Sequence, residues 1–182
     1  MPTRRDQNMD RGPRRFEVDP NNQRGRNQRT TDPYVFDEGL PEPALCTVCH
    51  AIYRNKRWYL KEKDYVEIQE HETATEVVCP ACRKMSDLYP EGVVTLKGDY
   101  LWQHEEEILN ILRNTENNAM AKNPLGRIMS IKPEGDALLV ETTEEKLAEH
   151  IGRALHKAHQ GELNIDWSDN HSLCRVTWER RE

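Results

Sequence analysis

Four of the five cysteines in this sequence fall into two Cys-x-x-Cys pairs, Cys46-Thr-Val-Cys49 and Cys79-Pro-Ala-Cys82. Each pair at this spacing forms a tight knuckle, and a β-hairpin built from the intervening residues 50–78 would bring the two knuckles together. Tetrahedral Zn²⁺ takes four thiolate ligands, so the pairs predict a zinc site formed by Cys46, Cys49, Cys79 and Cys82. Four protein ligands leave no open coordination position, which predicts a structural role for the metal.

Two redox-active dithiols, or four unrelated cysteines, are the alternatives. A thioredoxin-type motif requires a pair that opens a helix within a βαβ unit. The sequence predicts that context for neither pair. Val77 and Val78 indicate the end of a strand that delivers the second knuckle, which is a common zinc-ribbon arrangement. We therefore expect a four-cysteine zinc ribbon over residues 41–91, which begins at Pro41 and Pro43.

The composition is polar for a folded protein, with 36% hydrophobic and 32% charged residues in a chain of 182. This length allows one domain or two small ones, and the polarity predicts that part of the chain is unfolded. No apolar run approaches the length of a membrane span, and the N-terminus has no hydrophobic signal core. Four metal-binding thiols suit a reducing compartment, so we expect a cytoplasmic protein without a membrane partner.

The net charge of −6 conceals a strong asymmetry along the chain. Residues 1–30 contain eight arginines, no lysine and four acidic residues, so this segment carries +4 and the remainder −10. Residues 1–40 also lack apolar periodicity, which predicts a disordered tail. Guanidinium groups pair with phosphate and stack on bases. The tail is therefore a hypothetical RNA-binding arm whose candidate contacts are Arg4, Arg5, Arg14, Arg15, Arg24 and Arg26. The alternative is a solubilising tail without a partner.

A second group of candidate RNA contacts follows the first knuckle, where Arg54, Lys56 and Arg57 alternate with Tyr53, Trp58 and Tyr59. Cations interleaved with aromatic rings are typical of a nucleic-acid surface. The equally weighted alternative is that Trp58 covers the zinc site and the cations are solvated. His50 directly follows a predicted ligand, and we expect it to be a neighbour of the metal site and not a fifth ligand.

Residues 92–182 show the clearest secondary-structure pattern. Strands are predicted at 92–97, 127–131, 137–141, 162–167 and 174–179, with a turn at 133–135. One helix is predicted at 100–121, with Asp99 as N-cap and Glu105–Glu107 near its positive end. A second helix is expected to start at a capping box made by Thr142 and Glu145 and to end at Gly161.

The resulting order, β-α-β-β-α-β with one more terminal strand, predicts a ferredoxin-like α/β domain over residues 92–182, with both helices on one face of an antiparallel sheet. RNA-recognition motifs share this layout, but residues 93–97 and 137–141 lack their stacking aromatics. The fold class expected for the whole chain is therefore α+β, a zinc ribbon followed by a ferredoxin-like βαββαβ sandwich.

Other potential sites are weak. His150, His156 and His159 are expected to be solvated residues of the second helix, and Cys174 an inert thiol in the core. The sequence contains neither a phosphate-binding Gly-x-x-x-x-Gly-Lys loop nor a Gly-x-Ser-x-Gly elbow. No nucleophile, base and oxyanion donor can be assembled, so we expect neither an enzyme nor a small-molecule substrate.

Several elements together resemble one family, the large-ribosomal-subunit nuclear-export adaptors and their archaeal relatives. The likeness covers roughly residues 44–165 and rests on Cys46-Thr-Val-Cys49, Trp58, Val78-Cys79-Pro-Ala-Cys82, and Asp136–Thr143 with the helix that contains Ala148. This chain looks like the zinc-binding region of that family in a short form with a single zinc site. The resemblance implies binding to the large ribosomal subunit or its RNA, with zinc in a structural role.

The sequence thus predicts a non-enzymatic zinc-ribbon protein that binds ribosomal or other structured RNA. The alternative is a protein–protein interaction adaptor whose acidic body forms the binding surface. The salt dependence of binding distinguishes them, because contacts to phosphate weaken steeply as salt is added.

Overall fold

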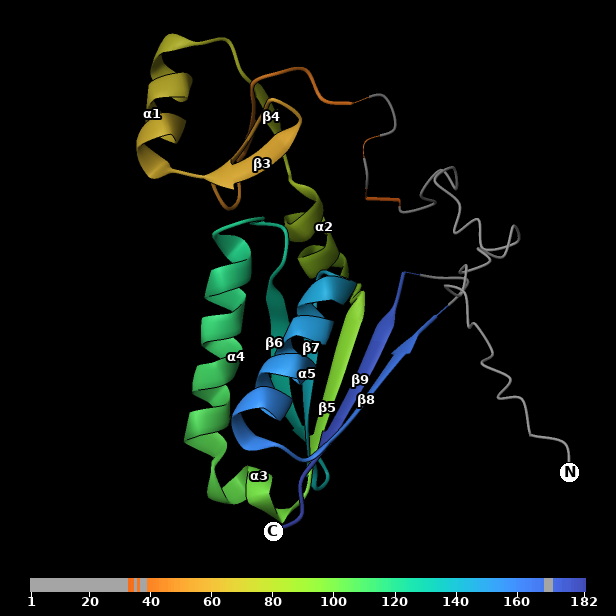
Figure 1. Ribbon diagram of the computed structural model, residues 1–182. Coiled ribbons are helices and arrows are strands. Elements are labelled where there is room, and N and C mark those ends of the chain that lie inside the picture. The colour runs from red at the N-terminus through yellow and green to blue at the C-terminus, as the bar shows by residue number, and fades with distance from the viewer. Residues whose placement is uncertain (1–32, 35, 37–38, 169–171) are drawn as a thin grey trace, which may run out of the picture. The chain divides into compact units, whose positions relative to one another are not determined.

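The computed structural model describes residues 33, 34, 36, 39–168 and 172–182. The chain divides into two units, residues 1–31 and 32–182, so every described residue belongs to the second. That unit is an α+β structure in which the described residues form two mixed sheets and five helices (Figure 1). None of these helices is both long and apolar enough to cross a membrane.

The first part, here named the cysteine module (residues 44–87), is built on a four-stranded sheet of order β3-β2-β1-β4. Its strands are β1 (Ala44–Cys46), β2 (Ala51–Arg54), β3 (Arg57–Leu60) and β4 (Thr75–Val77). Helix α1 (Glu62–His71) precedes β4 and packs Tyr65 and Ile68 against Leu45 and Ile52. The segment between the cysteine pairs therefore contains the short β2–β3 hairpin and a helix, and the parallel pairing of β1 with β4, not the predicted hairpin, brings the two pairs together.

Helix α2 (Pro80–Asp87) ends the cysteine module and leads into the second part of the fold. Pro80 occupies the first turn, where its missing N–H and fixed φ favour helix initiation. Leu88 terminates the helix in the left-handed conformation, with φ of 52°. Inside α2, Lys84 forms a buried ion pair with Glu91, with Nζ and Oε1 2.6 Å apart, which ties the helix to the start of the next strand.

The second part, here named the α/β domain (residues 91–182), contains a five-stranded sheet of order β6-β7-β5-β9-β8. The strands are β5 (Gly92–Lys97), β6 (Ile128–Glu134), β7 (Ala137–Thr142), β8 (Glu162–Trp167) and β9 (Cys174–Glu179). Helices α4 (Glu105–Met120) and α5 (Glu145–His159) cover one face of this sheet (Figure 1). The core lies between α5 and the alternate residues of the central strands, among them Val94, Leu96, Val140, Val176 and Trp178.

The position of β9 corrects the predicted antiparallel sheet. In a ferredoxin-like arrangement the strand after the second helix, here β8, would pair directly with β5. Instead β9 lies between them, parallel to β5 and antiparallel to β8. Burial agrees with this order: the inward residues Cys174, Val176 and Trp178 of the inner strand β9 are almost completely buried, whereas Leu163 and Ile165 of the edge strand β8 are only half-buried.

The predicted helix at 100–121 is two helices, α3 (Asp99–Gln103) and α4, because the backbone leaves the helical conformation at His104. Asp99 lies inside the first turn of α3, and Gly98 occupies the cap position that we assigned to Asp99. Gly98 has a φ of 99°, and a side chain there would collide with the Arg180 backbone. The close approach of the C-terminal segment therefore decides where α3 begins.

The predicted capping box at the start of the second helix is also wrong. Thr142 is the last residue of β7, where it pairs with Gly92, and its hydroxyl donates to the Glu144 carbonyl at 2.8 Å. Glu144 caps α5 without a side-chain hydrogen bond, and Glu145 is the first helical residue. The C-terminal end agrees with the prediction to within two residues, since α5 stops at His159 and Gly161 has a φ of 90°.

The contact of α5 with β9 and β8 gives a testable prediction at Gly152. A methyl group at this position would lie 2.5 Å from Val176 Cγ1 and 2.9 Å from Leu163 Cδ1. Alanine favours a helix over glycine by about 1 kcal/mol, but overpacking a core costs about 1–3 kcal/mol. We expect Gly152→Ala to lower the free energy of unfolding in urea denaturation. A stabilised variant would show that α5 can move away from the sheet.

Candidate metal centre

The first cysteine pair lies at the turn between β1 and β2. Cys46 is the last residue of β1 and is fully buried, and the His50 amide donates to the Cys46 carbonyl at 3.1 Å, which closes the turn. His50 has a φ of 61°, so the chain reverses at this point before β2 begins. This is the tight knuckle that the spacing predicts.

The second pair lies where β4 meets α2. Cys79 is the N-cap of α2 and Cys82 lies in its first turn, so this pair opens a helix. The physical reason is Pro80 at the first helical position, followed by helix-compatible residues. The strands on either side of α2, β4 and β5, belong to different sheets, so the βαβ context of a thioredoxin-type motif is absent, as expected. Strand β4 runs parallel to β1 with Cys46 opposite Val77, so both pairs emerge at the same end of the sheet.

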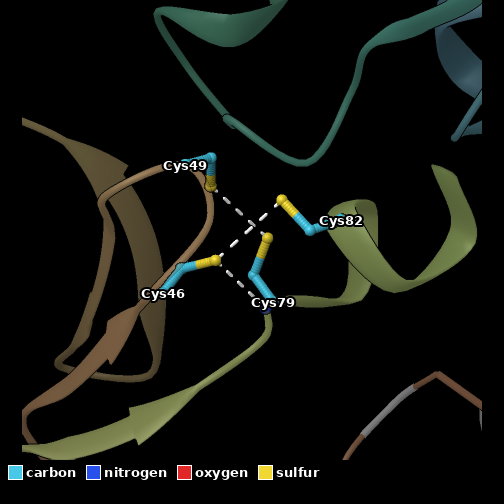
Figure 2. Close-up of side chains that lie close together, drawn as sticks. All are labelled: Cys46, Cys49, Cys79 and Cys82. Carbon is cyan, nitrogen blue, oxygen red and sulfur yellow. Dashed lines mark hydrogen bonds between the residues drawn. The ribbon is translucent and has the colours of Figure 1, made fainter. Parts of the chain in front are cut away.

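The four sulfur atoms form one cluster in which all lie within 4.8 Å of one another (Figure 2). Cys46 Sγ lies 3.9 Å from Cys82 Sγ, and Cys49 Sγ lies 3.6 Å from Cys79 Sγ. A tetrahedral ion with metal–sulfur distances of about 2.3 Å has sulfur–sulfur edges of roughly 3.8 Å. The four cysteines could therefore hold a metal ion without rearrangement.

The pairing of the sulfurs argues against two independent dithiols. Each of these two short contacts joins a cysteine of the first pair to one of the second. The Cys79 amide also donates to Cys46 Sγ at 3.3 Å, so the backbone of one pair supports the sulfur of the other. All five cysteines are free thiols. A shared ion accounts for this convergence, whereas separate redox pairs do not require it.

The acidities of the sulfurs are strongly coupled. Hydrogen bonds from Cys49 and Cys79 lower the pKa of Cys46. Hydrogen bonds with Cys46 and Cys49, together with burial, raise the pKa of Cys79. Burial raises the pKa of Cys82 to about 11. Ionisation of one sulfur thus opposes ionisation of its neighbours, and a bound cation would remove that opposition with release of protons.

Arg127 is a member of the site that the sequence analysis missed. It lies in the α/β domain just before β6, and its Nη2 atom donates to Cys49 Sγ at 3.0 Å. Its Nη1 atom lies 3.6 Å from Cys82 Sγ. Burial opposes the charge of this guanidinium, but the hydrogen bond to Cys49 and the charges of the cysteines raise the pKa of Arg127. Only its separation of 78 residues from Cys49 hid it, since no local pattern links them.

Of the candidate RNA contacts in the hairpin, Trp58 is half-buried and packs against the cysteine cluster. Its geometry therefore fits the interpretation that it covers the site. Arg54 forms an ion pair with Glu72. Lys56 and Arg57 are exposed at the tip of the β2–β3 hairpin, where the Glu42 carboxylate accepts the Asn55 and Lys56 amides.

His50 is a neighbour of the cluster, as predicted. Its ring stacks on Tyr65 with centroids 4.4 Å apart, and its Nδ1 atom lies 3.1 Å from a Glu62 carboxylate oxygen. Among the described residues, the group that could hold an ion consists of the four cysteines alone.

The N-terminal candidates, Arg4, Arg5, Arg14, Arg15, Arg24 and Arg26, lie outside the described residues and stay predictions. At the C-terminal end of the predicted tail, Tyr34 is buried, and its hydroxyl donates to Asp87 at 2.9 Å. Arg83 lies over the Tyr34 and Phe36 rings. These described residues of the predicted tail therefore pack on α2.

Two other predictions have different outcomes. Cys174 is buried in the core, as expected, and burial raises the pKa of this thiol to about 11. His159, by contrast, is buried and its Nδ1 atom lies 2.9 Å from the Tyr100 hydroxyl. We expected a solvated histidine, and the reason for the difference is that α3 places Tyr100 against the end of α5.

The fold and the site together define an α+β protein with a four-cysteine cluster. Comparison of the chain with protein-family models, curated proteins and solved structures finds no match.

Proposed function

We propose that this chain is a non-enzymatic, cytoplasmic zinc protein that binds ribosomal or other structured RNA. In this proposal residues 1–40 are an Arg-rich arm, residues 41–91 a variant zinc ribbon, and residues 92–182 a ferredoxin-like domain with one inserted strand. The observation that carries the metal assignment is the convergence of four cysteine sulfurs within 4.8 Å.

Zinc is the proposed ion because of the donor set. Four thiolates that can surround an ion tetrahedrally suit Zn²⁺ or iron, whereas magnesium and calcium require oxygen ligands. The four sulfurs would complete the coordination shell, so the ion would stabilise the fold and would not activate water.

The proposed RNA surface combines the arm with the tip of the β2–β3 hairpin. The arm carries +4, and Lys56 and Arg57 are exposed cations on a rigid turn. Arg54 contributes less to this surface, because Glu72 already pairs with it. We assign Trp58 to the stability of the cysteine module, since it packs against the sulfurs.

The resemblance to the large-subunit nuclear-export adaptors supports the choice of RNA. It makes large ribosomal subunits the first particles to test.

A salt titration tests this proposal. Each phosphate neutralised on single-stranded RNA contributes about −0.7 to the slope of log affinity against log salt. Removing residues 1–30 should flatten the slope most, and the double variant Lys56→Gln, Arg57→Gln should flatten it by up to roughly 1.4. Arg113→Gln is the matched control, because Arg113 is an exposed cation on α4.

The assay uses full-length, zinc-loaded protein with ribosomal RNA and with large subunits. Absence of binding at low salt would refute the RNA proposal. Equal slopes for the hairpin variant and the control would remove Lys56 and Arg57 from the surface.

A protein–protein adaptor is the second candidate. Apolar side chains on and beside α2 are exposed, namely Val78, Met85, Leu88 and Tyr89, and Leu88 is 79% exposed. Exposed apolar side chains are available for contact with a partner protein. Binding to a partner through them would depend only weakly on salt, which separates this candidate from the first.

A further inference from the structure

Arg127 connects the cysteine cluster to the α/β domain. The cysteines belong to β1, α2 and the turns beside them, whereas Arg127 precedes β6 of the other sheet. Its two terminal nitrogens reach one cysteine from each pair, Cys49 and Cys82. Leu125 of the same loop packs against the cluster as well. The loop between α4 and β6 thus contacts the site from the α/β domain.

The loop that carries Arg127 is held in place by the α/β domain. The Arg127 amide donates to Thr143 Oγ1 at 2.8 Å, and the Thr143 amide donates back to the Arg127 carbonyl at 2.9 Å. Thr143 is fully buried, and its hydroxyl also donates to the Leu125 carbonyl. Asn123 donates to Glu144 at 2.9 Å. These bonds fix the backbone at the corner where β7 ends.

The side chain of Arg127 is fixed by the loop itself. Its Nε atom donates to the Pro124 carbonyl at 2.7 Å, which leaves both terminal nitrogens directed at the sulfurs. Because the fork is oriented in advance, little further ordering is needed when it bonds to the sulfurs.

An occupied site would carry a negative charge that the Arg127 guanidinium can compensate. Four thiolates and one divalent ion leave a net charge of −2 on a cluster that is largely buried. Buried charge without compensation is unfavourable, and charge-assisted hydrogen bonds to ligand atoms are the usual compensation.

We propose that Arg127 retains the metal by hydrogen bonding to the Cys49 and Cys82 sulfurs, and that through it metal binding further stabilises the 123–127 loop, which the α/β domain already holds. This inference depends on the metal part of the proposed function, and it names a positioning residue that the ligand motif does not contain.

Release of zinc to a colorimetric chelator tests the first half. Loss of a group that supports metal ligands lowers affinity by about 10–100-fold. We expect Arg127→Gln to lower zinc affinity within that range and to speed release. Arg127→Lys should restore part of the affinity, because it keeps a cation without the fork. Arg113 is an exposed arginine on α4, so the control variant Arg113→Gln should release zinc at the wild-type rate.

Hydrogen exchange on the full-length chain tests the second half. The amides of Leu125, Gly126 and Arg127 are bonded within the loop or to Thr143. Removal of zinc from the wild type should speed their exchange, and this difference between loaded and stripped protein should vanish in Arg127→Gln. This comparison uses wild-type protein first, so it is informative even if Arg127→Gln folds poorly.

The outcomes separate the inference from the proposal on which it depends. Wild-type protein that binds no metal would overturn both. Wild-type protein that binds zinc, with Arg127→Gln releasing it at the wild-type rate, would overturn the inference alone. If the amides of the 123–127 loop exchange at the same rate in zinc-loaded and zinc-free wild-type protein, the coupling to the α/β domain would be overturned.

Discussion

Cys79→Ser is expected to abolish zinc binding and to unfold the cysteine module. Cys79 is fully buried, caps α2, and places its sulfur 3.6 Å from that of Cys49. Structural zinc contributes apparent binding free energies of about 10–16 kcal/mol in small zinc-binding peptides, and that free energy stabilises the fold. Zinc per chain, measured by elemental analysis, should fall from about one to near zero.

The loss of the metal should also be visible in the melting curve. The cysteine module buries few hydrophobic side chains, and Leu45, Ile52, Tyr65 and Ile68 form one small cluster. Without the ion, this small core should contribute too little free energy to keep the module folded. Cys174→Ala is the matched control, since Cys174 is a buried cysteine of β9 outside the cluster. It should keep about one zinc per chain.

Wild-type protein that contains no zinc, or that melts identically before and after chelation, would contradict this prediction. Iron in place of zinc would leave the four ligands correct and change the identity of the ion, because both metals accept tetrahedral thiolates.

Leu155→Ala is expected to destabilise the α/β domain by about 2–5 kcal/mol. Leu155 lies on α5 and is completely buried in the core that α4, α5 and the sheet share. Truncation removes apolar contacts and leaves a cavity that the surrounding helices and strands cannot fully close. Urea denaturation with an unchanged m-value measures the effect.

Leu88→Ala is the control for this truncation. Leu88 is 79% exposed and follows the last residue of α2. The same chemical change there should alter stability by less than about 0.5 kcal/mol. Similar losses for both variants would mean that Leu155 is not in a packed core.

The candidate metal ligands could be identified from local sequence alone. Two Cys-x-x-Cys pairs specify their knuckles through local geometry, and the structure brings Cys46, Cys49, Cys79 and Cys82 together. The strands at 92–97 and 137–141 and the long helix α5 were predicted as well. Alternation and helical periodicity are local properties of the chain, which is why these elements could be found.

The way these elements combine depends on long-range packing. The place of β9 between β5 and β8 is set by its parallel pairing with β5, which is distant in sequence, and neighbouring residues do not encode that pairing. Thr142 resembles an N-cap in sequence, yet pairing with Gly92 in the sheet outweighs the local capping preference.

The same reasoning explains why Arg127 was missed. An isolated arginine beside Gly126 has no periodicity or spacing that indicates a role, and its contact with Cys49 spans 78 residues. The contact exists because the corner of β7 holds the loop and the parallel pairing of β1 with β4 holds the sulfurs. Short-range spacing therefore identifies the candidate ligands, whereas long-range packing decides which other groups surround them.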